Sequence, residues 1–220
     1  MKGIFLNLVL LFTLFFVSAQ KNEFGGYYNQ RLSLFRSLPD EPDEIIMLGN
    51  SITDGGEWGE LLPGYNVKNR GISGDVTAGI LYRLDEVTSA KPAKVFLLIG
   101  INDLARGIEA DSVFRNICLI AHKIREATPG TDVYIQSILP VNPSFEKFAG
   151  HVDKTSSVKN INQKLKEWCS ENNVQFVNLY DLFTEKDSDY LNPEFTNDGL
   201  HLTAKGYLKW VQIIYPFIKP

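Results

Sequence analysis

Short apolar segments alternate with longer amphipathic segments along most of this chain. The apolar segments lie at residues 44–48, 67–72, 95–99, 133–139 and 175–179. Between and after them, apolar side chains recur at helical spacing over residues 76–88, 111–127, 155–171 and 203–217. Residues 95–99 are continuously apolar, which is typical of a strand buried on both faces of a parallel sheet. The pattern predicts an α/β fold, a three-layer α/β/α sandwich around a five-stranded, mostly parallel sheet.

Pro and Gly residues mark the expected ends of several elements. An N-terminal helix over residues 22–38 should stop at Pro39, and a short helix that follows Gly55-Gly56 should close at Pro63. Asp111 is predicted to cap the helix that starts there. Residues 140–153 are expected to form a long irregular loop.

The first segment of the chain has the pattern of an export signal. Lys2 is followed by an almost wholly apolar run over residues 4–17 and by the small residues Ser18 and Ala19. We therefore expect a signal peptide over residues 1–19, a single domain over residues 20–220, and a periplasmic or secreted protein. A membrane anchor is the alternative, but the run is short for a bilayer span of about 20 residues, so no stable membrane insertion is expected.

Charge and cysteine content narrow the range of partners. The formal net charge is −4 and no basic run occurs, so nucleic acid is not an expected partner. Cys118 and Cys169 could pair in an exported protein or be buried as small apolar residues, and the sequence leaves both open. It also leaves the oligomeric state open.

Three predicted strands end in polar, Gly-rich turns, and the turns contain Ser51, Gly74 and Asn102. The carboxyl ends of parallel neighbours meet at one edge of an open sheet, where reacting groups collect. Ser51 is the candidate nucleophile there. The backbone N–H groups of Ser51 and Gly74, with the side-chain amide of Asn102, are the candidate oxyanion hole.

A candidate base for this serine lies near the C-terminus. Asp198 precedes His201 by three residues in a predicted turn, a spacing that lets the carboxylate bind imidazole Nδ1 while Nε2 faces the serine. The other histidines, His122 and His151, have no comparable local carboxylate. Ser51, Asp198 and His201 are therefore predicted as a catalytic triad.

Together these blocks resemble those of the SGNH, or GDSL-type, esterase and lipase family. Its serine, glycine, asparagine and Asp-x-x-His blocks correspond to Ser51, Gly74, Asn102, and Asp198 with His201, in the same order. The resemblance implies a flavodoxin-like sandwich that uses no metal or cofactor and hydrolyses esters through an acyl-enzyme. Asn50 stands where the family usually has Asp. Taken singly, each block could instead be a helix cap or a turn, and the Gly-x-Ser-x-Gly elbow of α/β-hydrolases is absent because Thr53 replaces its second glycine.

The substrate is predicted mainly from the same resemblance, which is to a branch containing platelet-activating-factor acetylhydrolase-like enzymes and sialate or other carbohydrate O-acetylesterases. Trp58 is a candidate surface for a sugar or a small acyl group, with core packing as the alternative. Arg70 and Arg106 could bind a substrate carboxylate, with structural ion pairs as the alternative.

The leading hypothesis is an exported esterase that removes acetyl groups from a small-molecule or glycan ester such as O-acetylated sialic acid. The alternatives are a lysophospholipase or platelet-activating-factor acetylhydrolase-like lipid esterase, and a non-catalytic carbohydrate-binding module.

Overall fold

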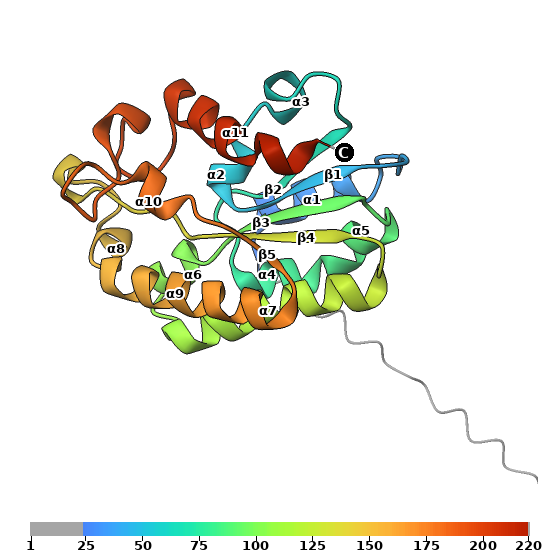
Figure 1. The fold of residues 1–220 in the computed structure, drawn as a ribbon, viewed down its shortest axis with the longest axis horizontal. Helices are drawn as coiled ribbons and strands as arrows, with labels where there is room; N and C mark the ends of the chain where they lie inside the picture. The colour runs from blue at the N-terminus through green and yellow to red at the C-terminus, as the bar shows by residue number, and fades with distance from the viewer. Residues whose placement is uncertain (1–23, 220) are drawn as a thin grey trace, which may run out of the picture.

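The computed structural model describes residues 24–219, so the predicted signal peptide lies outside the described residues. A single sheet runs through the middle of the molecule (Figure 1). Its strands pair in the order β2-β1-β3-β4-β5 and every pair is parallel. The strands are β1 (Ile45–Gly49), β2 (Val67–Gly71), β3 (Lys94–Leu98), β4 (Asp132–Gln136) and β5 (Gln175–Val177). The predicted α/β sandwich is confirmed, with a sheet that is wholly parallel.

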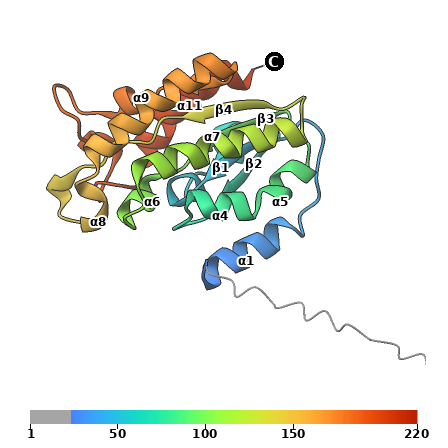
Figure 2. The same cartoon turned by 90° about the horizontal axis from the view of Figure 1, so that it is seen from below.

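Helices cover both faces of this sheet, as Figures 1 and 2 show from two directions. One face carries α4 (Thr77–Tyr82), α5 (Leu84–Ser89), α7 (Ala110–Ala127) and α9 (Thr155–Asn172). The other carries α2 (Ser51–Asp54), α3 (Trp58–Leu61) and α11 (Ala204–Ile218). The remaining helical segments are α1 (Gly26–Phe35), α6 (Ile101–Ala105), η1 (Pro143–Phe145), α8 (Ala149–Val152), α10 (Tyr180–Phe183) and η2 (Pro193–Phe195).

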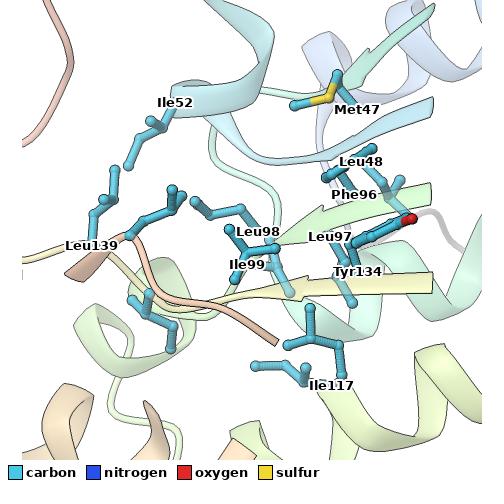
Figure 3. Close-up of a cluster of buried hydrophobic side chains, with 14 of the residues drawn as sticks. Met47, Leu48, Ile52, Phe96, Leu97, Leu98, Ile99, Ile117, Tyr134 and Leu139 are labelled. Carbon is cyan, nitrogen blue, oxygen red and sulfur yellow. The ribbon is translucent and has the colours of Figure 1, made fainter. Parts of the chain in front are cut away.

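The central strands are buried because they are apolar on both faces. All five residues of β1 are buried, as are the last four of β3. Figure 3 shows their side chains packed with Ile52, Ile117 and Leu139. The rings of Phe96 and Tyr134, on neighbouring strands, stack with centroids 4.4 Å apart. This core fixes the strand ends, and therefore the turns that follow them.

The continuous helix predicted over residues 76–88 is wrong, because the chain breaks it at Arg83. Arg83 has φ −105° and ψ 14°, outside the helical range, and separates α4 from α5. Its guanidinium is buried, pairs with Asp75, and donates to the carbonyl oxygens of Gly49 and Arg70. Helical periodicity does not reveal a long side chain that reaches inward for such partners.

Two smaller expectations also differ from the structure. Asp111 does not cap α7, which begins one residue earlier with Glu109 in the N-cap position, and instead pairs with Lys164 of α9. The expected irregular loop over residues 140–153 contains η1 and α8.

Both cysteines are free thiols, with Cys169 buried and Cys118 half-buried, and burial raises the pKa of each to about 12. Within residues 24–219, no helix is both long and apolar enough to cross a bilayer.

Candidate active site

Ser51 opens the short helix α2 directly after β1 ends at Gly49. Asn50 occupies the N-cap position, and its Oδ1 accepts a hydrogen bond from the Ile52 N–H at 3.0 Å. An aspartate at the same position could accept the same bond. The replacement of the usual family aspartate by Asn50 therefore preserves the cap of the helix that carries Ser51.

The residues predicted as a triad form one hydrogen-bonded chain. His201 Nε2 lies 3.0 Å from Ser51 Oγ, and His201 Nδ1 lies 2.8 Å from Asp198 Oδ2. Since an ionised carboxylate only accepts, the Nδ1 proton faces Asp198 and Nε2 is free to accept the serine proton. The two chain segments, which are 150 residues apart, thus meet in the geometry expected of a nucleophile and its base.

The turn around Asp198 keeps its carboxylate ionised. Asp198 Oδ1 accepts from the backbone N–H groups of His201 at 2.8 Å and Leu200 at 2.9 Å. Burial by itself would raise the pKa of Asp198, but these N–H groups and the His201 ring favour the charged form and together lower the pKa below its ordinary value. An ionised Asp198 can orient the imidazole and stabilise an imidazolium.

The three predicted oxyanion donors follow the ends of neighbouring strands. Gly74 has φ +80°, a left-handed conformation that favours glycine, in the turn after β2. Asn102 lies in α6 after β3, and its Nδ2 donates to the carbonyl oxygen of Asp75 at 2.9 Å. Among the described residues, the backbone N–H groups of Ser51 and Gly74 have no protein acceptor. Donors at this edge are therefore available to a developing negative charge.

Close packing joins the first two of these turns. A Cβ on Gly71, the last residue of β2, would lie 2.2 Å from the backbone nitrogen of Asp54 in α2, so only glycine fits there. The Asp54 carboxylate accepts hydrogen bonds from the Ser73 N–H and hydroxyl and from the hydroxyl of Tyr27 in α1. The segment that carries Ser51 is therefore held against the segment that carries Gly74.

Trp58 and Arg70 are not available to a substrate, so their predicted binding roles are wrong. Trp58 is 1% exposed, packs edge-on against Trp210 of α11, and donates from its indole N–H to the Thr53 carbonyl oxygen at 2.8 Å. Arg70 is buried in an ion pair with Glu86 at 2.5 Å. For both residues the structural alternative is correct, because tryptophan and arginine occur in buried contacts as well as in binding sites.

Arg106 is the one predicted substrate-binding residue that remains exposed near the site. Its Nη2 donates to the Gly74 carbonyl oxygen at 2.6 Å. It also lines a cavity of about 190 Å³ with Ser73, Gly74 and the start of α1. Arg106 therefore lies beside a predicted oxyanion donor, where a charged substrate group could approach it.

Two residues outside the predicted triad and oxyanion hole contact this site from the segment before α9: Phe148, which the sequence offered with Phe145 only as a candidate for an acyl channel of the alternative lipid esterase, and His151, which it did not place in the site. The ring of Phe148 lies edge-on to that of His201, with centroids 5.2 Å apart, and is 38% exposed. His151 Nε2 lies 3.0 Å from Asn102 Oδ1. Neither residue belongs to a recognisable motif, and only the fold of residues 140–153 brings them here.

Over residues 24–219, no cluster of three or more His, Cys, Asp or Glu side chains is arranged to hold a metal ion.

The comparisons with known proteins agree with this fold. The model of the GDSL-like lipase/acylhydrolase family matches residues 47–209, which is most of the chain. The chain therefore belongs to this family of carboxylic-ester hydrolases.

Among solved structures, a protein from Streptococcus pneumonia, provisionally described as a platelet activating factor, superposes with a TM-score of 0.79. It is 28% identical, and the match covers 88% of this chain and 93% of that one. Among curated relatives, platelet-activating factor acetylhydrolase IB subunit alpha2 of Rattus norvegicus is 26% identical, over 81% of this chain and 77% of its own length.

A second kind of curated relative is longer than this chain. The N-acylneuraminate cytidylyltransferase of Streptococcus agalactiae serotype III (strain NEM316) is 27% identical over 64% of this chain. The match spans only 32% of the cytidylyltransferase, so the matched part of this chain corresponds to about a third of that protein.

Proposed function

We propose that this protein is an exported serine esterase that removes acetyl groups from carbohydrate, such as O-acetylated sialic acid. The observation that carries the catalytic part is the hydrogen-bonded chain from Asp198 through His201 to Ser51. The acetyl preference is supported by the similarity to a platelet-activating factor acetylhydrolase subunit, and the choice of a sialic acid by the similarity to an N-acylneuraminate cytidylyltransferase.

In the first half of the proposed reaction, Ser51 Oγ attacks the ester carbonyl carbon while His201 Nε2 takes the hydroxyl proton. The carbonyl oxygen becomes an oxyanion that accepts from the N–H groups of Ser51 and Gly74 and the amide of Asn102. The carbon–oxygen bond to the alcohol then breaks, and the imidazolium returns its proton to the departing alkoxide. An acetyl-Ser51 ester and a free alcohol result.

Water completes the cycle by the same route in reverse. His201 Nε2 takes a proton from water, whose oxygen attacks the acetyl carbonyl, and Ser51 leaves as the hydroxyl once it recovers the proton. The net reaction is ester plus water to carboxylic acid plus alcohol. Asp198 stays ionised throughout and stabilises the charged imidazole.

The first test is hydrolysis of p-nitrophenyl acetate by the mature protein and by Ser51→Ala. Ser51→Ala removes the nucleophile, so it should lower kcat by about 10⁴-fold or more. The circular dichroism spectrum and the Tm should stay close to those of the wild type. Turnover by Ser51→Ala that matches the wild type would overturn the proposal.

N-terminal analysis of the exported protein should give Gln20 as the first residue, and an uncleaved Met1 would contradict export by signal cleavage.

Arg106 is the candidate contact for a substrate carboxylate. Arg106→Gln should raise KM for O-acetylated sialic acid while KM for p-nitrophenyl acetate, which has no carboxylate, stays unchanged. An equal change in both KM values would argue against a carboxylate contact at Arg106.

A lipid esterase related to platelet-activating-factor acetylhydrolases or lysophospholipases is the second candidate. The exposed ring of Phe148 beside His201 favours it, because an apolar surface at the base could contact an acyl chain. A series of p-nitrophenyl esters separates the two: acetate preference supports the deacetylase and long-chain preference the lipase. Glycan binding without hydrolysis, unchanged by Ser51→Ala, would instead indicate a non-catalytic binding module.

A further inference from the structure

His151 contacts the candidate oxyanion hole but lies outside the sequence blocks that resemble those of the family. It lies in α8, which packs on α6, the helix that contains Asn102. The packing is close, because a Cβ on Gly150 would lie 3.3 Å from the carbonyl oxygen of Ala105 at the end of α6. This brings His151 Nε2 to 3.0 Å from Asn102 Oδ1, across 49 residues of sequence.

The contacts of Asn102 determine which way its amide faces. On one side lies the carbonyl oxygen of Asp75, 2.9 Å away, which can only accept, so Nδ2 must be the atom that faces it. Oδ1 therefore faces His151, and since Oδ1 can only accept, His151 Nε2 must carry a proton. A flipped amide would set two acceptors against each other at Asp75.

The surroundings of His151 favour a neutral ring. Burial lowers the pKa of His151, and the nearby His201, Arg106 and Lys154 act in the same direction, while the Phe148 carbonyl oxygen opposes them. A neutral ring with its proton on Nε2 donates to Asn102 without adding a charge beside His201.

We infer that His151 is a positioning residue of the esterase site: it donates to Asn102 Oδ1 and so aims the amide at the oxyanion. One Nδ2 proton is used by Asp75 and the second is left for the substrate oxygen. With both ends of the amide bonded, the direction of that second N–H is fixed before substrate arrives, which is what electrostatic preorganisation requires. The inference rests on the proposed function.

The test compares variants that keep or lose the donor. His151→Leu keeps a side chain of similar size that cannot donate, whereas the side-chain N–H of His151→Gln should reach Asn102 Oδ1. Removing an oxyanion donor costs about 10²–10³ in rate, so loosening one should lower kcat for p-nitrophenyl acetate by about tenfold. KM should change little, because the contact strengthens only in the transition state. His151→Gln should recover most of the lost kcat.

A double-mutant cycle with Asn102→Ala distinguishes positioning from direct substrate contact. If His151 acts through Asn102, His151→Leu should have no further effect on kcat in the Asn102→Ala background. His122→Ala is the matched control, since His122 is exposed on α7 and should leave kcat and Tm unchanged.

Three outcomes would overturn the inference. In an active wild-type enzyme, it fails if His151→Leu keeps full kcat, or if its effect is undiminished beside Asn102→Ala. It fails also if His151→Gln is no better than His151→Leu while both fold with wild-type Tm. A wild type that does not hydrolyse the ester would instead refute the proposed function, and the inference with it.

Discussion

Asp75 and Arg83 form an ion pair whose side chains are both fully buried. Nε and Nη2 of Arg83 each lie 3.0 Å from Asp75 Oδ2. Arg83 also donates to the carbonyl oxygens of Gly49 at 3.3 Å and Arg70 at 2.9 Å. Since Gly49 ends β1 and Asp75 follows Gly74, this pair joins the strand before the nucleophile to the turn with an oxyanion donor.

Breaking this pair should be costly. Arg83→Leu leaves the Asp75 carboxylate buried without its counter-ion, which typically destabilises a protein by about 3–5 kcal/mol. The matched control is Arg36→Leu, which breaks the exposed Arg36–Asp85 pair and should cost less than about 1 kcal/mol. Denaturant unfolding measures the loss in free energy of unfolding for both variants. Equal losses would show that the buried Arg83–Asp75 pair stabilises the fold no more than the exposed Arg36–Asp85 pair does.

Trp58 should affect stability and not substrate binding. Trp58→Phe removes the indole N–H that donates to Thr53 and leaves a gap against Trp210, so Tm should fall by several degrees, as expected for a loss of about 1–2 kcal/mol. KM for an acetylated sugar should not change. A raised KM with unchanged Tm would restore Trp58 as a sugar contact.

The sequence predicted the parts of this molecule that depend on local pattern. Continuous apolar runs defined the strands, and the polar turns after them placed Ser51, Gly74 and Asn102 at one edge. Asp198 and His201 could be paired because their contact spans a single turn of chain. The parallel order of the strands then brought these segments together.

Features that depend on distant partners could not be predicted in this way. His151 contacts Asn102 only because α8 packs on α6, and no spacing in the sequence records that contact. Trp58 and Arg70 are residue types that occur both in binding sites and in buried pairs, so their burial became evident only in the fold. Arg83 breaks its helix for contacts on other segments.

Stability should depend on pH through Asp198. Its pKa is lowered on folding, so the folded state binds its proton less readily than the unfolded state does. The resulting stabilisation is present above the unfolded pKa of about 4 and is lost as pH falls through the folded pKa. The unfolding free energy of wild type minus that of Asp198→Asn should therefore shrink as pH falls below about 4. A difference that grows on acidification would contradict a lowered pKa.

Phe148 should contact the acyl group and carry backbone strain. It has φ 53° and ψ 50°, a left-handed conformation that is costly for a side chain with a Cβ, and such strain often occurs at functional sites. Phe148→Ala should lower the rate for p-nitrophenyl hexanoate relative to acetate, because the apolar ring beside His201 that could contact the acyl chain is removed.

Two comparisons control this experiment. Phe148→Gly should show the same acyl selectivity as Phe148→Ala but be more stable by up to about 1 kcal/mol, because glycine adopts this conformation without strain. Leu119→Ala, at an exposed apolar residue of α7, should leave selectivity unchanged. An unaltered ratio in both Phe148 variants would remove Phe148 from the acyl site.

The most direct test of the central claim is to follow p-nitrophenyl acetate hydrolysis with rapid mixing, then label the enzyme with a serine-directed phosphonate and map the modified residue. The account predicts burst release of p-nitrophenol, stoichiometric inactivation and a label on Ser51, all absent in Ser51→Ala. Turnover without a label on Ser51, or well-folded protein with neither burst nor label, would contradict it.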